Sequence, residues 1–336
     1  MSDPDAPLLD VEDLSCDIDT PVGVARVLRN VSLRLAQGRT LGLVGESGSG
    51  KSMLIKSILD LAPRAARVTG RVMFEGVELT GMRAAERRKF VGRRVGVVLQ
   101  NPMTSLNPVV HVGRQIEESA RYHLKLSKAQ AREVAIDLMA RVGLPDPRDS
   151  YSHYPHQFSG GMKQRVTIAA ALACEPDLLI ADEATTALDV TVQKDILDLL
   201  QMIQEERRMS MILVTHNLGI VAGRTDEVAV MYGGRIVETA RTNALFRSPR
   251  HRYTDALLAA MPRADHAAHT TLRTIAGQPP DPLQPLAGCP FAPRCPVAEA
   301  RCADSMPPTT FEAADARAFA CYVPRTLVAP PPAEVH

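Results

Sequence analysis

The chain has 336 residues, of which 45% are hydrophobic and 23% are charged, and its formal net charge is +1. This composition is typical of a soluble globular protein with one sizeable domain and an accessory one, and the balanced charge argues against nucleic acid as the main ligand. The longest nearly apolar run, residues 166–174, falls short of the roughly 18 residues of a membrane span. The start of the chain, residues 1–5, is polar and acidic rather than a secretory signal, so we expect a cytosolic protein.

The first third of the chain predicts strands. Residues 8–35 alternate apolar and polar side chains, which favours antiparallel strands with one solvated face. The apolar run 41–44 predicts a buried strand, and residues 70–79 predict a short strand pair that turns at Gly76. Another buried strand is expected over 94–99, ending at Gln100.

From about residue 112 the hydrophobic period becomes helical. Ser127 is a good N-cap for a helix over 128–142, and Ser159 opens another helix. Strands follow at 177–181 and 211–214 with a helix over 192–206 between them, and Gly233 with Gly234 predicts a tight hairpin. Alternating strands and helices indicate an α/β fold with a parallel core sheet, an antiparallel β layer from the start of the chain, and a helical insertion at about 111–160.

The composition changes near residue 260. Beyond it lie 14 of the 25 prolines and four of the six cysteines. We therefore expect one domain over 1–260, a small irregular cysteine-rich domain over 261–325, and a disordered tail over 326–336.

One motif predicts a nucleotide phosphate site. Residues 45–52 read Gly45, Glu46, Ser47, Gly48, Ser49, Gly50, Lys51 and Ser52, which is the pattern G-x-x-x-x-G-K-[ST]. Glycines let backbone N–H groups wrap a phosphate at a helix N-terminus, the lysine neutralises the β- and γ-phosphates, and the serine hydroxyl ligates Mg²⁺. A chance glycine-rich loop is the alternative, and the predicted strand before the motif and helix after it argue against that alternative.

A second motif is the apolar run that ends in Asp182 and Glu183. An isolated run of this kind is better interpreted as a strand that ends in solvated acids. Beside a phosphate loop, however, Asp182 can reach the Mg²⁺, normally through a water, and Glu183 can polarise the attacking water. We therefore expect both carboxylates to belong to the nucleotide site.

A third motif, Phe-Ser-Gly-Gly-Met-Lys-Gln-Arg at 158–165, resembles the signature of ATP-binding cassette (ABC) ATPases. Other elements of that family follow in the right order: Gln100 for the Q-loop, residues 187–189 with Asp189 for the D-loop, and His216 for the switch histidine. Taken singly, Gln100 is better explained by a polar strand end and His216 by a core histidine, and Ser159 with Gly160 and Gly161 could be only a helix cap. Five elements in one order favour the family.

Finer resemblance points to a subfamily. Residues 100–108, 154–165 and 184–191 look like those of ATPase subunits of oligopeptide/dipeptide importers, and the similarity extends over about 8–325. It implies a dimer that sandwiches two ATP molecules, so that Ser159–Gly161 of one subunit close over the nucleotide of the other. It also implies two transmembrane permeases as partners, an extracytoplasmic solute-binding protein acting through them, and a peripheral location at the cytoplasmic face of the inner membrane.

The resemblance also implies roles for single residues. Lys51 and the loop amides hold the phosphates, while Ser52, Gln100 and Asp182 organise Mg²⁺. Glu183 acts as general base, and His216 contacts the γ-phosphate. Import of nickel or another small solute stays open, as does a soluble, non-transport ABC ATPase acting on DNA or ribosomes. The latter class usually has a long coiled-coil insertion or two cassettes in one chain, and this sequence has neither.

Four cysteines near the end predict a metal site. Cys289, Cys295, Cys302 and Cys321 have the spacing C-x5-C-x6-C-x18-C, which lacks the C-x2-4-C pairs usual for zinc. Four thiolates can hold a [4Fe–4S] cluster or zinc, or can remain free thiols. The resemblance implies a [4Fe–4S] cluster, so we expect iron–sulfur first and zinc second.

The sequence departs from the family's pattern in how adenine would be held. No Phe, Tyr or Trp precedes Phe74, which excludes base stacking from the first strands. Val22 or Val24 is the expected apolar contact. Ala184 stands where a proline commonly follows the catalytic glutamate, a change expected to alter the turn without removing function.

Overall fold

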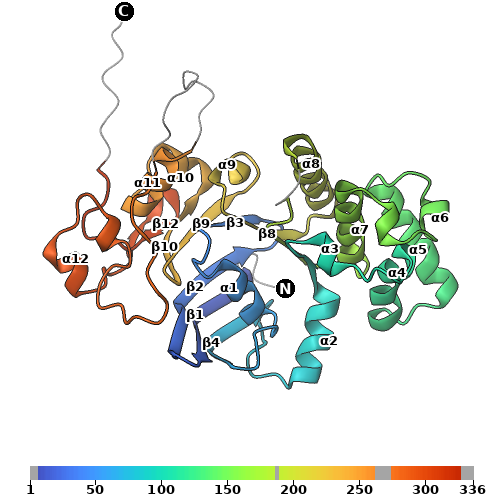
Figure 1. Ribbon diagram of the computed structural model, residues 1–336, viewed down its shortest axis with the longest axis horizontal. Coiled ribbons are helices and arrows are strands. Elements are labelled where there is room, and N and C mark those ends of the chain that lie inside the picture. The colour runs from blue at the N-terminus through green and yellow to red at the C-terminus, as the bar shows by residue number, and fades with distance from the viewer. Residues whose placement is uncertain (1–6, 186–188, 262–273, 327–336) are drawn as a thin grey trace, which may run out of the picture.

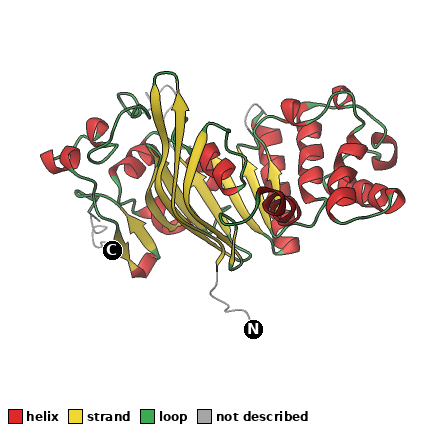
Figure 2. Ribbon diagram, turned by 90° about the horizontal axis from the view of Figure 1, so that it is seen from below, coloured by secondary structure: helices red, strands yellow, loops and turns green. Residues whose placement is uncertain are grey.

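The computed structural model describes residues 7–185, 189–261 and 274–326, which form two β-sheets flanked by helices (Figure 1). Figure 2 shows the strands gathered in the middle of the molecule with helices on either side. Most of the predicted disordered tail, and Ala187 and Leu188 of the predicted D-loop, lie outside the described residues. None of the described helices is long and apolar enough to span a bilayer.

The first strands form an antiparallel sheet in the order β2-β1-β4-β5. The long strand β1 pairs with β2 on one side and with β4 on the other. Buried and exposed side chains alternate along much of β2, so one face packs inward and the other meets solvent. This confirms the predicted antiparallel layer. The strands are β1 (Pro7–Thr20), β2 (Gly23–Ala36), β4 (Ala66–Phe74) and β5 (Val77–Glu78).

The second sheet has the order β11-β12-β10-β9-β3-β8-β7-β6. Five consecutive strands of this sheet pair in parallel, in the order β9, β3, β8, β7 and β6. This confirms the predicted parallel core. Strands β3, β7 and β8 are buried along their whole length, because helices and the other sheet cover them. The strands are β3 (Thr40–Val44), β6 (Val95–Val98), β7 (Leu178–Asp182), β8 (Ser210–Thr215), β9 (Glu227–Tyr232), β10 (Arg235–Arg241), β11 (Thr310–Glu312) and β12 (Arg317–Phe319).

The longer helices lie where the helical period predicts them, with one exception. Helix α2 carries six charged side chains in its eleven residues and buries only Arg87 and Val91, so it has no apolar stripe to reveal it. The helices are α1 (Lys51–Ile58), α2 (Ala84–Arg94), α3 (Pro102–Ser105), α4 (Val112–His123), α5 (Lys128–Arg141), α6 (Pro147–Ser150), α7 (Gly160–Leu172), α8 (Val190–Arg207), α9 (Leu218–Val221), α10 (Thr242–Arg247), α11 (Arg252–Ala259) and α12 (Ala300–Asp304), with short 3₁₀ turns at η1 (Pro155–Gln157), η2 (Ala292–Arg294) and η3 (Ala313–Asp315).

Helices α4 to α7 form a lobe at one end of the molecule, on the right in Figure 1. Ser127 caps α5 as predicted, in a capping box with Gln130. Inside the lobe the Tyr151 hydroxyl donates a 2.6 Å hydrogen bond to the buried Glu117 carboxylate. The buried side chains of the lobe, among them Ile116, Met139 and Val166, belong to the same hydrophobic core as those of β6 and β7, so the lobe is packed onto the second sheet.

The carboxyl-terminal segment lies at the other end and extends the core sheet (Figure 1). Its strand β12 pairs with β10, and Arg317 on β12 forms an ion pair with Glu238 on β10, both side chains having no exposed surface. The Glu238 carboxylate also accepts the backbone N–H groups of Arg250 and His251, just before α11. The segment is thus packed onto the main body, and the boundary near residue 260 stays a prediction.

Candidate nucleotide site

The phosphate loop, residues 45–52, joins the end of β3 to the start of α1, as predicted. Two of its glycines occupy conformations and spaces closed to other residues. At Gly45 (φ +158°) a Cβ would lie 2.1 Å from the carbonyl oxygen of Met231, and at Gly50 (φ +106°) it would lie 3.0 Å from that of Val27. Only glycine fits at either position, and the resulting loop presents its N–H groups at a helix N-terminus, where anions bind.

Lys51 lies back across the loop. Its Nζ donates hydrogen bonds of 2.7 Å to the carbonyl oxygen of Gly45 and 3.0 Å to that of Glu46. Burial lowers the pKa of Lys51, while the carboxylates of Glu183, Asp182 and Glu46 oppose that shift. The ammonium group is therefore already inside the loop, where it can exchange carbonyl oxygens for phosphate oxygens.

Ser52 and Asp182 meet beside the loop. The Ser52 hydroxyl donates a 3.3 Å hydrogen bond to Asp182 Oδ1 at the end of β7. Burial raises the pKa of Asp182, and the hydrogen bond from Ser52 opposes that shift. A hydroxyl and a carboxylate are hard oxygen donors of the kind that Mg²⁺ prefers, so these two residues fit a magnesium site.

The side chain of Glu183 contacts two further predicted site residues, Gln100 and His216. Its carboxylate accepts a 2.9 Å hydrogen bond from Gln100 Nε2, and its other oxygen lies 3.3 Å from His216 Nδ1. The three residues follow strands β7, β6 and β8, which are parallel neighbours, so their side chains meet at the carboxyl edge of the sheet. Glu183 has φ +48°, an uncommon conformation for a residue other than glycine, directly after the end of β7. In this arrangement the amide nitrogen of Gln100 is directed at Glu183 rather than at Ser52 and Asp182.

The signature residues lie on a different part of the molecule. Ser159 is the N-cap of α7 and accepts the N–H of Met162. Gly161 lies against α8, since a Cβ there would approach Val192 Cγ1 to 2.8 Å. Asp189 is the N-cap of α8 and accepts the Val192 N–H at 2.9 Å. In Figure 1 the start of α7, which Ser159, Gly160 and Gly161 form, belongs to the helical lobe, apart from α1 and the phosphate loop. Their predicted role therefore needs a second subunit and stays a prediction.

Two residues at the phosphate loop escape sequence reasoning. Arg294, from the cysteine-rich segment, pairs with the Glu46 carboxylate at 2.7 and 3.1 Å. The Tyr253 hydroxyl accepts the backbone N–H of Glu46 at 2.8 Å. Both residues lie more than 200 positions along the chain from Glu46, so no local pattern points to them. The only sequence signal is that Arg294 falls between two clustered cysteines.

The four clustered cysteines are free thiols. Burial is the main reason that the pKa of Cys289 is raised to about 11, and the nearby Cys321 and Cys302 contribute to the rise. Within the described ranges, however, no three or more His, Cys, Asp or Glu side chains are arranged to hold a metal ion. The thiols as they lie therefore do not fit a closed cluster site, and the iron–sulfur prediction gains no support here.

The predicted adenine contacts remain exposed. Val22 and Val24 flank the turn between β1 and β2 with 78% and 42% of their surfaces accessible. Apolar side chains this exposed are available to a base, and their role stays a prediction.

Comparison with known proteins fits this geometry. Residues 28–186 match the family model described as "ABC transporter", and residues 237–302 match that of the "Oligopeptide/dipeptide transporter, C-terminal region". The dipeptide transport ATP-binding protein DppD of Bacillus subtilis is 46% identical over 86% of this chain and 87% of its own length. This chain belongs to the ABC transporter ATPase family. Within it, the similarity to oligopeptide/dipeptide transport proteins spans both the cassette and the segment beyond it, as the sequence resemblance predicts.

Further relatives of this ABC ATPase agree. The oligopeptide transport ATP-binding protein OppD of Escherichia coli is 43% identical over 94% of this chain and 93% of its own length. Among solved structures, the dimeric post-hydrolysis state of the cassette MJ0796 with ADP and Pi has a TM-score of 0.62 at 25% identity, and covers 70% of this chain and 98% of that one.

Proposed function

We propose that this chain is the ATP-hydrolysing subunit of an importer for dipeptides and oligopeptides. The observation that carries the proposal is the convergence of the phosphate loop, the Ser52–Asp182 pair and the Gln100–Glu183–His216 cluster at one edge of the sheet. The match of residues 237–302 to the oligopeptide/dipeptide transporter region supports peptides as the solute.

Each residue of the site has a role in hydrolysis. The loop amides and Lys51 would hold and neutralise the ATP phosphates. Ser52 and Asp182 would hold Mg²⁺, which would neutralise phosphate charge. Glu183 would accept a proton from the attacking water, because Gln100 and His216 orient its carboxylate at the same edge of the sheet as Ser52 and Asp182. Catalysis of this kind consists mostly of positioning and charge stabilisation.

A complete site requires a second subunit, identical or paralogous. Ser159 to Gly161 offer a small-residue helix N-terminus suited to an anion, and they belong to the lobe that does not hold the phosphate loop. In the proposed dimer these residues close over the nucleotide of the partner, with Asp189 beside them. The similarity to the MJ0796 cassette, which is dimeric in its complex with ADP and Pi, supports this arrangement.

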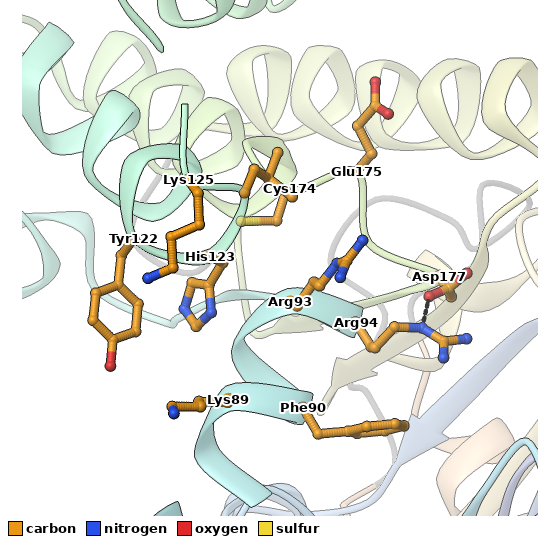
Figure 3. A pocket seen from close by; sticks show the side chains of 11 residues that line it. Lys89, Phe90, Arg93, Arg94, Tyr122, His123, Lys125, Cys174, Glu175 and Asp177 are labelled. Atoms are coloured by element: carbon orange, nitrogen blue, oxygen red, sulfur yellow. Dashed lines mark hydrogen bonds and ion pairs between the residues drawn. The ribbon is translucent and has the colours of Figure 1, made fainter. Parts of the chain in front are cut away.

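The permease surface is proposed to lie between α2 and the helical lobe. A pocket of about 540 Å³ there includes Leu99, Leu106 and His123, and a neighbouring one of about 870 Å³ shares His123. Figure 3 shows the second pocket, with Lys89, Arg93 and Lys125 around it and Tyr122 at its side. Exposed apolar side chains beside the Q-loop, Leu99 (47%) and Met103 (63%), suit a membrane partner that follows the movement of Gln100.

Such a partner would hold the chain at the cytoplasmic face of the inner membrane, as a peripheral subunit. The solute-binding protein outside the membrane would set which solute is transported. Because that choice is made outside this chain, import of nickel or another small solute is the second candidate. A soluble, non-transport ATPase is the third.

The cysteine-rich segment carries a separate proposal. The spacing of Cys289, Cys295, Cys302 and Cys321, together with the sequence resemblance, is what favours a [4Fe–4S] cluster, with zinc second. No step of the hydrolysis described above depends on it. Anaerobically purified protein with about four irons per chain would support the cluster. Colourless protein with one zinc per chain would replace iron with zinc, and metal-free protein would exclude both.

Copurification tests the transport function. The tagged chain is purified from detergent-solubilised membranes, and we expect two polytopic membrane proteins to copurify with it. Leu99→Asp should remove them while ATP binding persists, and Leu61→Asp, at a comparably exposed leucine after α1, should keep them. Peptides eluted from the associated solute-binding protein would support peptide import, and nickel would support the second candidate. An absence of membrane partners from the wild-type preparation would favour the soluble ATPase.

A further inference from the structure

Arg294 is an extensively hydrogen-bonded side chain beside the phosphate loop. Only 4% of it is exposed. Nη1 donates to Glu46 Oε2 and the Tyr232 hydroxyl, Nη2 donates to Glu46 Oε1 and the Ile275 carbonyl oxygen, and Nε donates to the Ala276 carbonyl oxygen. These bonds use all five guanidinium N–H donors. An arginine bonded in this way has one available geometry, and so fixes the carboxylate that it holds.

Glu46 is held from the carboxyl-terminal part of the chain on two sides. Arg294 binds its carboxylate, and the Tyr253 hydroxyl accepts its backbone N–H. The rings of Tyr253, Tyr232 and Phe291 pack together behind this contact, with centroids 4.3 to 5.5 Å apart. Phe291 and Arg294 both lie between Cys289 and Cys295. The cysteine-rich segment therefore contacts the nucleotide site through one residue of the loop.

A carboxylate in a phosphate-binding loop needs compensation. Glu46 carries a negative charge beside the place that the loop offers to an anion, and its side chain is only 26% exposed, so water screens it incompletely. Arg294 supplies the opposite charge at hydrogen-bonding distance. The backbone carbonyl oxygen of Glu46 also accepts a hydrogen bond from Lys51 Nζ. A shift of Glu46 would therefore change the position of Lys51, the side chain that would bind the phosphates.

We propose that Arg294 is a positioning residue of the nucleotide site, which acts through Glu46 and couples the cysteine-rich segment to ATP binding. The inference rests on the proposed function, because it assigns a regulatory contact to that same site. Coupling of this kind is reciprocal, so ATP binding also stabilises the segment around Arg294. A purely structural arginine would anchor the segment without affecting the affinity for ATP.

A double-mutant cycle on the full chain separates these two roles. The dissociation constant for MgATP is measured for wild type, Arg294→Met, Glu46→Gln and the double variant. We expect Arg294→Met to raise it about tenfold, the lower end of the effect of losing a charge-assisted hydrogen-bonded partner. In the Glu46→Gln background the same substitution should have little further effect, because no uncompensated charge is left in the loop.

Arg301→Met is the matched control. Arg301 lies in the same segment and pairs with Glu299, but both side chains are more than half exposed and neither reaches the loop. The dissociation constant of the Arg301→Met variant for MgATP should equal that of wild type. If Arg294→Met fails to fold, Arg294→Lys replaces it in the cycle, since it keeps the charge but loses the two parallel bonds to Glu46, and a smaller rise is expected.

Two results would overturn the inference. One is an unchanged dissociation constant for a folded Arg294 variant, and the other is an equal rise in both Glu46 backgrounds. If the wild-type chain itself did not bind MgATP, the proposed function would fail, and the inference with it. A wild type that binds while the cycle shows no coupling removes only the role of Arg294.

Discussion

Glu183→Gln is the substitution that separates ATP binding from hydrolysis. The amide oxygen of the new side chain can still accept the 2.9 Å hydrogen bond from Gln100, so the local geometry is expected to persist. What is lost is the carboxylate that we propose accepts a proton from water. Loss of a general base slows a reaction by about 10²- to 10⁴-fold, which equals about 2.7 to 5.5 kcal/mol of transition-state stabilisation.

The assay has two readouts. Single-turnover phosphate release should slow by the factor given above, while the dissociation constant for MgATP stays at the wild-type value, because Lys51 and Ser52 are untouched. With hydrolysis blocked, ATP should also trap a dimer that light scattering detects after size exclusion. Glu206→Gln removes an exposed carboxylate on α8 that pairs with Arg141, and should behave as wild type in both readouts.

Two results would refute the assigned role. Phosphate release at the wild-type rate would show that another group accepts the proton. Slow release together with weakened ATP binding would show that the substitution disturbs the loop and not the chemistry alone.

Two further predictions concern stability. Arg317→Met leaves the buried Glu238 without its charge partner, so the free energy of urea unfolding should fall by about 3 to 5 kcal/mol, whereas an unchanged value would mean that the pair does not anchor β12. Burial, followed by the bond to Glu117, raises the pKa of Tyr151 to about 12, so the folded state keeps a proton that the unfolded chain loses. Stability should therefore fall as the pH rises from about 10 to about 12, and Tyr151→Phe should make this fall shallower than in wild type or in the exposed Tyr122→Phe control. Equal slopes in all three proteins would contradict the assignment.

Much of the fold could be predicted from local patterns. The alternation in β1 and β2, the apolar runs of β3, β7 and β8, and the Ser127 cap each depend on neighbouring residues, and the structure has them where the sequence predicts them. Helix α2 could not be found in this way, because it is stabilised by Arg87 bonding to carbonyl oxygens at the end of α1 rather than by an apolar stripe.

The site residues likewise fall into those that local motifs predict and those that depend on distant contacts. Lys51, Ser52, Asp182 and Glu183 could be found because each belongs to a short motif whose chemistry requires its residue type. Arg294 could not, because its role depends on a contact across 248 positions of the chain. The cysteines illustrate the converse limit, since their spacing predicts a cluster but does not determine how the four thiols are arranged.

Peptide uptake into proteoliposomes tests the central claim most directly. The chain is reconstituted with its permeases, its partner ATPase subunit if that is a paralogue, and the solute-binding protein, and uptake of a labelled dipeptide is measured together with phosphate release. With the wild-type chain, peptide-loaded binding protein should stimulate both peptide uptake and phosphate release. When the Lys51→Ala variant replaces the wild-type chain, uptake and phosphate release should both be abolished. A rate of phosphate release that is the same with and without peptide, or peptide uptake that persists with the Lys51→Ala variant, would contradict the account.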